Sequence, residues 1–209
     1  MSGPFVAAAE VAARLVGRPE VAARWGEPSA LAAYTVGGLV AHLLLATERT
    51  EGVLDEEEPV GRLVVGAAEF YGVNRVGTAA DNETGLHPIV RAAAEKIAES
   101  GPAAVAERFT ALVDRLRPRL PADRLVTILQ VPDGATTFET YLRTRVVELV
   151  VHVDDIATSV GIDVEPPPES VDVAVGVFVE LARARSGDLA VIRAFSRAER
   201  AAPDTLRVL

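Results

Sequence analysis

The most constraining feature of the sequence is a segment, residues 144–156, that is apolar on nearly every side and yet carries a row of ionisable groups. Glu148 and His152 are four residues apart, and Asp155 follows three residues later. At helical spacing these three side chains share one face. A helix that is apolar almost all round is usually buried, so we expect this row to lie inside a folded domain.

Charged groups inside a protein are costly unless they are paired or bound to a metal ion. For Glu148 and His152, one solution is a divalent cation that is held by a carboxylate oxygen and an imidazole nitrogen. A simpler interpretation is that Arg145, Glu148 and His152 form a row of ion pairs along a half-exposed helix. The Glu-x-x-x-His spacing alone leaves both interpretations open.

A third candidate ligand lies in another predicted helix. His42 stands in an apolar run and has no acidic residue within four positions. A lone histidine of this kind is commonly a residue of the core. Together with Glu148 and His152, however, it completes a set of two histidines and one carboxylate. Such a set leaves coordination positions open for water or substrate, as in catalytic zinc sites.

Further polar residues extend this prediction. Arg145 and Asp155 fall on the same helical face as Glu148 and His152, so we expect them to orient these two side chains. His87, the third histidine of the chain, precedes a proline at the start of a predicted helix and is a weaker candidate ligand. The residues by themselves identify neither a catalytic group nor a cofactor-binding residue.

Apolar periodicity predicts helices joined by short connections, with boundaries at capping residues, glycines and prolines. The expected helices cover residues 4–24, 35–50, 62–77, 88–116, 136–160, 170–185 and 189–199, with breaks at Gly17–Pro19 and Gly101–Pro102 and with Thr136 or Thr137 and Ser170 as caps. A short strand is expected within 125–131. Long helices with few alternating strands predict a mainly all-α fold, a helix bundle with one or two short strands.

Composition narrows the range of functions. The chain has 209 residues, a net charge of -9 and no run of Lys or Arg, which argues against binding to nucleic acid or to an anionic membrane. No apolar stretch approaches the roughly 20 residues of a membrane span, and the N-terminal residues show no secretion signal, so we expect a cytoplasmic protein. The absence of cysteine excludes disulfides, thiolate ligands and a protein thiol as nucleophile.

Two parts of the sequence resemble a known family. The motifs are Trp25–Ser29 with Tyr34–Leu43, and Arg145–Asp155. They resemble the DinB-like proteins of actinobacteria, in particular the N-terminal domain of mycothiol-dependent maleylpyruvate isomerase, over most of residues 10–160. The resemblance implies a four-helix bundle with one divalent metal, usually zinc. It also implies that His42, Glu148 and His152 are the ligands, the same three residues that their chemistry suggests.

The resemblance further implies the use of mycothiol, a small thiol. This fits a chain without cysteine, because any sulfur nucleophile must then be a cofactor. A metal-bound thiol ionises near neutral pH. In the isomerase, the thiolate adds to a conjugated cis double bond, the resulting single bond rotates, and the thiol leaves. The expected function is a mycothiol-dependent isomerase or thiol S-transferase acting on a small molecule, with zinc, or else nickel or manganese, as the metal.

The expected domains are a metal-binding bundle at 1–165 and a C-terminal extension, packed on the bundle, at 166–209. The isomerase has a separate C-terminal domain that contributes to its active site. The chain after Pro168 is too short for such a domain, so maleylpyruvate itself is in doubt as the substrate. The alternatives are a metal-dependent hydrolase, a non-catalytic bundle that binds metal or a partner, and a structural homodimer whose apolar helices pair across a two-fold axis.

Overall fold

The computed structural model describes residues 1–72, 87–120, 123–129, 131–200, 202 and 205–208. The predicted buried helix is α7, Phe138–Val160. At its start, the backbone N–H of Thr140 donates to Oγ1 of Thr137. At its end, Gly161 has φ +71°, a left-handed conformation that glycine adopts without steric cost. Both boundaries agree with the sequence prediction.

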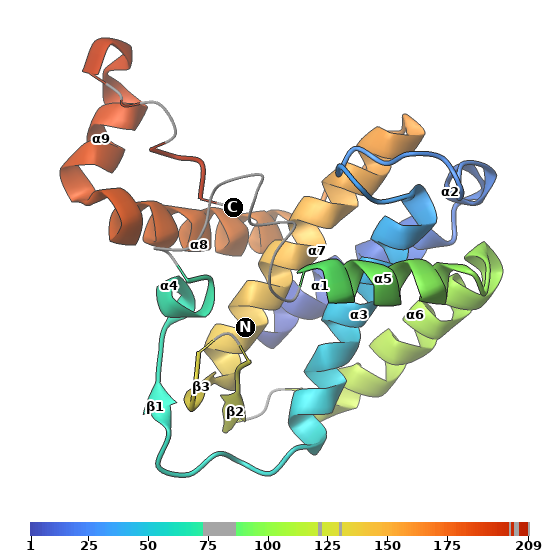
Figure 1. The fold of residues 1–209 in the computed structure, drawn as a ribbon, viewed down its shortest axis with the longest axis horizontal. Helices are drawn as coiled ribbons and strands as arrows, with labels where there is room; N and C mark the ends of the chain where they lie inside the picture. Colours follow the sequence, from blue (N-terminus) through green and yellow to red (C-terminus); the bar gives the residue numbers. More distant parts are fainter. Residues whose placement is uncertain (73–86, 121–122, 130, 201, 203–204, 209) are drawn as a thin grey trace.

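Four long helices enclose the main core. They are α1 (Ser2–Val16), α3 (Val36–Asp55), α6 (Pro102–Leu116) and α7. Both α1 and α3 contact α6 and α7, so the four helices surround one apolar interior (Figure 1). The expectation of a mainly all-α helix bundle is confirmed.

The other helices lie around this bundle. The short helix α2 (Pro19–Ala23) follows α1 after a break at Gly17 and Arg18, and Gly101, with φ +87°, separates α5 from α6. Both breaks were expected from the sequence. The outer helices are α5 (His87–Ala98) against α3, α8 (Pro168–Ser186) against α7, and α9 (Asp188–Ser196) after α8 (Figure 1). Single 3₁₀ turns occupy Arg117–Arg119 and Ala198–Arg200.

The helix predicted for residues 62–77 is wrong in its described part. That segment forms strand β1 (Leu63–Val64) and the short helix α4 (Ala67–Phe70), and residues 73–77 lie outside the described residues. Strand β1 pairs in parallel with β3 (Gly134–Thr137), which pairs antiparallel with β2 (Leu125–Thr127). Pairing between β1 and β3 joins positions far apart in the chain, so the local apolar pattern does not reveal it.

Helix α8 also begins differently from the prediction. Its first residue is Pro168, whose missing N–H would be unpaired in any first helical turn. Ser170, the predicted cap, instead donates from Oγ to the carbonyl oxygen of Pro4 at 2.7 Å. This bond ties α8 to the start of α1. Val147 of α7 is buried in a second apolar cluster together with Val177 and other residues of α8.

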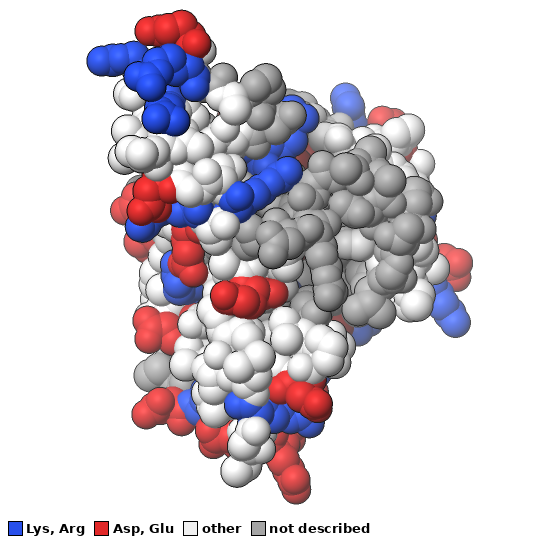
Figure 2. Space-filling model, turned by 60° about the vertical axis from the view of Figure 1, so that its left-hand side comes forward, with Lys and Arg blue, Asp and Glu red and all other residues white. Residues whose placement is uncertain are grey.

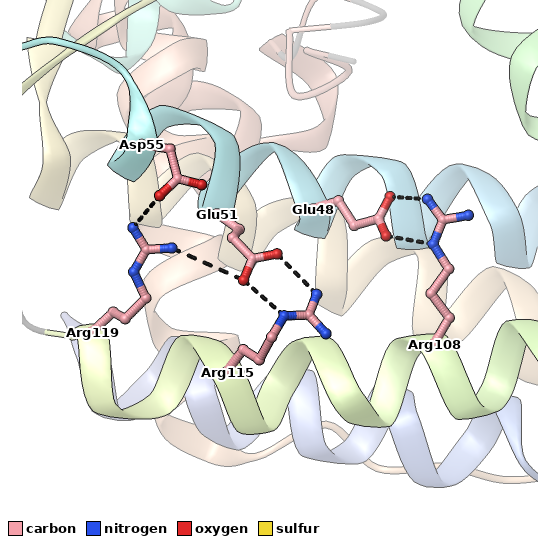
Figure 3. A network of polar contacts seen from close by, with 6 residues as sticks. All are labelled: Glu48, Glu51, Asp55, Arg108, Arg115 and Arg119. Atoms are coloured by element: carbon pink, nitrogen blue, oxygen red, sulfur yellow. Dashed lines mark hydrogen bonds and ion pairs between the residues drawn. The ribbon is translucent and has the colours of Figure 1, made fainter.

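A row of ion pairs joins the outer sides of α3 and α6. The acidic groups lie on α3, and the guanidinium groups lie on α6 and on the 3₁₀ turn that follows it. Because the pairs are largely exposed, each contributes little to stability on its own. The partners are Glu48 with Arg108, Glu51 with Arg115, and Asp55 and Glu51 with Arg119 (Figure 3).

The surface carries both signs of charge. On the face shown in Figure 2, acidic and basic side chains of the described residues are interspersed and do not form a single basic field. In the described part of the chain, no helix combines the length and the apolar character that a membrane crossing requires.

Candidate metal centre

Helices α3 and α7 bring the three predicted ligands into one cluster. Nε2 of His42 lies 3.9 Å from Oε2 of Glu148, and Nε2 of His152 lies 3.3 Å from the same oxygen. One potential ligand atom from each side chain lies within 4.8 Å of the other two. The two imidazole rings are 5.0 Å apart and nearly perpendicular. The side chains that the sequence singled out therefore share a site that could hold a metal ion.

Two glycines position the turn of α3 that precedes the histidine ligand. A Cβ atom on Gly37 would lie 2.5 Å from the ring of Trp25, and a Cβ atom on Gly38 would overlap the carboxylate of Glu95. That carboxylate, on α5, accepts hydrogen bonds from the backbone N–H and the hydroxyl of Thr35. The glycines thus allow α5 and the tryptophan to approach the start of α3 closely.

Asp155 lies where it can orient one of the histidines. Its Oδ2 is 3.0 Å from Nδ1 of His152, and the other ring nitrogen of His152 faces Glu148. In metal sites, a carboxylate on the outer nitrogen of a histidine commonly fixes its tautomer and ring orientation. By contrast, Nδ1 of His42 is buried and has no hydrogen-bond partner among the described residues.

Arg145 lies on the other side of the carboxylate ligand. Its Nη2 is 3.8 Å from Oε1 of Glu148, and its Nε donates to Oγ1 of Thr144 at 3.2 Å. The guanidinium carbon is 5.5 Å from the ring centre of Phe70 and 5.1 Å from that of Tyr141. The two oxygens of Glu148 therefore face different neighbours, Oε2 the histidines and Oε1 the arginine.

Sequence reasoning missed most of the aromatic residues around the site. The ring of Tyr34 lies 5.4 Å from that of His42, and Tyr71 donates from its hydroxyl to the carbonyl oxygen of Thr144. With Tyr141, these are all the tyrosines of the chain. In a chain with only 5% aromatic residues, three tyrosines are few enough that each could have been considered as a candidate site residue from the sequence.

His87, the weaker candidate ligand, is exposed at the start of α5. It does not belong to the cluster of potential ligand atoms that the described residues form. Its influence on the cluster is electrostatic: the charge of His87 contributes to lowering the pKa of His42. The geometry thus favours a three-residue ligand set over one that includes the third histidine.

Without a bound ion, the three groups have strongly shifted pKa values. Burial, together with the charge of His152, lowers the pKa of His42 to about 4. Burial alone would raise the pKa of Glu148, but the hydrogen bond from His152 and the charge of Arg145 lower it to about 2. Burial alone would lower the pKa of His152, but its hydrogen bonds to Asp155 and Glu148 outweigh this effect and raise the pKa to about 9. At neutral pH the metal-free site therefore contains a neutral His42 and a charged His152–Glu148 pair.

The donor set fits a divalent metal ion. Two imidazole nitrogens and one carboxylate oxygen form the ligand set of several catalytic zinc sites, in which a further coordination position is open. The described residues add no fourth His, Cys, Asp or Glu to the group. The ligands would come from two helices of the bundle, a common arrangement for metal sites in such folds.

Comparison with known proteins agrees with this arrangement. The family described as mycothiol maleylpyruvate isomerase N-terminal domain matches residues 5–157, a span that begins in α1, ends in α7 and includes His42, Glu148 and His152. Helices α8 and α9 lie beyond the matched span. Comparison with curated proteins and with solved structures finds no match. Since the family match covers well over half of the 209 residues, the chain belongs to the mycothiol maleylpyruvate isomerase N-terminal domain family.

Proposed function

We propose that the protein binds one divalent metal ion through His42, Glu148 and His152 and uses a thiol cofactor, mycothiol, in an isomerase or S-transferase reaction on a small molecule. The observation that carries the proposal is the convergence of three potential ligand atoms within 4.8 Å, in a chain of this family. Zinc is the expected metal, because two histidines and a carboxylate suit it, and nickel and manganese are the alternatives.

Each side chain of the cluster has a definable role in this proposal. His42 and His152 supply nitrogen atoms, and Glu148 supplies Oε2, the oxygen that faces both rings. Asp155 forms a hydrogen bond with Nδ1 of His152, so that Nε2 is the nitrogen available to the ion. Because His152 is protonated in the metal-free site, it must release a proton when it becomes a ligand.

The composition of the chain supports an external thiol. There is no cysteine among the 209 residues, so a sulfur nucleophile has to be a small molecule. A bound divalent ion lowers the pKa of a coordinated thiol and so makes the thiolate available near neutral pH. The side chains of the three proposed ligands are between 12% and 22% exposed, so the site is largely enclosed and still accessible to a small molecule.

The first experiment is elemental analysis of untagged protein purified without chelator. We expect a stoichiometric amount of zinc, or of another transition metal, in the wild type. His152→Ala should lose it, because one of three ligands is removed. His87→Ala is the matched control, since this exposed histidine lies outside the cluster, and it should retain the metal. A wild type that remains metal-free after soaking with zinc, nickel and manganese would sink the proposal.

The second experiment tests the thiol. Cobalt-loaded protein is titrated with mycothiol or 2-mercaptoethanol while the near-ultraviolet absorption is recorded. Direct coordination of sulfur produces a sulfur-to-cobalt charge-transfer band, which should be absent in His152→Ala. A protein that binds cobalt but shows no such band would contradict the thiol-dependent reaction and favour the metal-dependent hydrolase or a non-catalytic metal site.

A further inference from the structure

Arg145 is enclosed beside the candidate metal centre and yet has few polar partners. Its side chain is 10% exposed, and its one hydrogen bond within the described part of the chain runs from Nε to Thr144. The nearest carboxylate oxygen, on Glu148, is 3.8 Å away, which is too long for a hydrogen bond. A guanidinium carries five N–H donors. Most of the donors of Arg145 therefore lack an acceptor among the described residues, and they reach solvent, since none of its nitrogens is a fully buried atom without a partner.

Aromatic rings hold this guanidinium in place. Phe70 and Tyr141 lie 5.5 Å and 5.1 Å from its central carbon. Tyr71, which follows Phe70, is tied to α7 by its hydrogen bond to Thr144 and so anchors the segment that supplies the first ring. Rings stabilise a cation through their faces, but they offer no strong acceptor for its N–H groups. The unpaired donors are thus preorganised for an acceptor that the described residues do not supply.

Until a thiolate binds the ion, the charges around the centre leave one positive charge without a partner. A divalent ion and Arg145 together outweigh the carboxylates of Glu148 and Asp155 by one positive charge, with both histidine ligands neutral. A buried charge without compensation is costly. The planar guanidinium fork matches the two oxygens of a carboxylate better than a single sulfur atom.

We propose that Arg145 is a specificity-determining residue that binds a carboxylate group of the small molecule acted on at the metal centre. The inference rests on the proposed function, because it places this group beside the bound ion. Arg145 then selects anionic molecules over neutral ones of the same shape. In the ligand-free protein the aromatic rings keep the guanidinium in position.

The test uses zinc-loaded protein and isothermal titration calorimetry with acetate, together with acetamide as its neutral isostere. Arg145→Met, which removes the charge, should bind acetate about tenfold or more weakly than the wild type does. Its affinity for acetamide should be unchanged. Arg143→Met is the matched control: Arg143 lies on the same helix but pairs with Glu180 at 2.7 Å, so its loss should leave acetate binding unaltered.

The possible outcomes separate this inference from the proposed function. Equal acetate affinity of Arg145→Met and wild type, at equal zinc content, overturns the role of Arg145 and leaves the metal proposal intact. A parallel titration with 2-mercaptoethanol identifies the anion: if Arg145→Met weakens thiol binding and not acetate binding, the carboxylate assignment is wrong. A wild type that takes up no zinc overturns both proposals.

A further variant covers the case in which Arg145→Met does not fold, as judged by its thermal unfolding. Arg145→Lys keeps the charge but has no planar fork. It should bind acetate more weakly than the wild type and still prefer it to acetamide. Wild-type acetate affinity in this variant would show that the fork has no role and would overturn the bidentate recognition proposed here.

Discussion

At the residue scale, the site depends on which atom of each side chain faces which neighbour. Oε2 of Glu148 faces two histidine nitrogens, and Oε1 faces Arg145. The two histidines differ as well: Nδ1 of His152 contacts Asp155, whereas Nδ1 of His42 has no partner among the described residues. Helix α7 therefore supplies two of the three candidate ligands and also the side chains that contact them. Helix α3 supplies the third candidate ligand, which has no such partner among the described residues.

The contact between Asp155 and Nδ1 of His152 predicts the effect of Asp155→Asn. The substitution removes the negative charge on the outer nitrogen of His152 and allows the amide to favour the wrong tautomer. We expect the affinity for zinc to fall about 10- to 100-fold, the range for residues that support metal ligands. Competition with a chromophoric chelator measures it. Asp154→Asn, at the exposed neighbouring position, serves as the control and should bind zinc as the wild type does. Equal affinities in the two variants would show that Asp155 does not support the ligand.

The metal-free protein should have a maximum in stability near pH 6.5, because the two histidines shift in opposite directions from that value. The pKa of His42 is lowered to about 4, so its contribution is present above pH 6.5 and is lost as the pH falls toward 4. The pKa of His152 is raised to about 9, so its contribution is present below pH 6.5 and is lost as the pH rises through 9. Each slope is at most about 1.4 kcal/mol per pH unit.

Urea denaturation in the presence of a chelator, at a series of pH values, measures both limbs. His42→Ala should flatten the acid limb, and His152→Ala the alkaline limb. The acid limb retains a contribution below about pH 4.5 from Glu148, whose lowered pKa makes its stabilisation disappear as the pH falls toward 2. A profile that neither substitution changes would contradict the assignment of the limbs to these histidines.

At the element scale, the long helices and one strand were predictable, whereas the pairing of the small sheet was not. Helix α7 carries its boundaries in its own sequence, with a threonine cap and a glycine stop. Strand β2 lies within the segment 125–131 in which a strand was expected, and this prediction is confirmed. Strand β1, by contrast, becomes a strand only because it pairs with β3. The same error concealed Phe70 and Tyr71, since the predicted helix gave no reason to place them beside α7. The three candidate ligands, which the structure brings into one cluster, were identified because helical spacing and the family resemblance both indicated them.

The close approach of α3 to Trp25 predicts the effect of Gly37→Ala. The new Cβ atom would displace an indole ring whose N–H donates to the carbonyl oxygen of Ala98 at 3.0 Å. We expect a loss of about 1–3 kcal/mol in the free energy of unfolding, as for other overpacked sites. Thermal or urea unfolding of the metal-free protein measures the loss.

A helical glycine elsewhere in the chain provides the control for this prediction. Gly176 lies within α8 and is exposed, and a Cβ atom added to it would have no contact within 4 Å among the described residues. Gly176→Ala should therefore be neutral or stabilise the protein by up to about 1 kcal/mol, because alanine has the higher helix propensity. A similar loss in both variants would show that the packing against Trp25 is not the cause.

At the scale of the whole molecule, the candidate centre joins two helices of the bundle that are already held from outside. Helix α3 packs against α6, where the row of ion pairs lies, and against α5, where Glu95 bonds to Thr35, while α7 packs against α1 and α8. The three candidate ligands therefore converge from two helices whose positions other contacts of the bundle support.

Because the ion would bind the folded chain and not the unfolded one, zinc should stabilise the molecule as a whole. At a free zinc concentration of about 100 times the dissociation constant, the expected gain is about 2.7 kcal/mol. For a chain of this length, that gain corresponds to a rise in Tm of roughly 5–10 °C. Differential scanning calorimetry with zinc and then with excess chelator measures the rise and its reversal. His152→Ala should show no rise, whereas His87→Ala should respond as the wild type does. An equal rise in His152→Ala would mean that zinc binds elsewhere, and the two helices would then hold an ion-pair cluster instead of a metal centre.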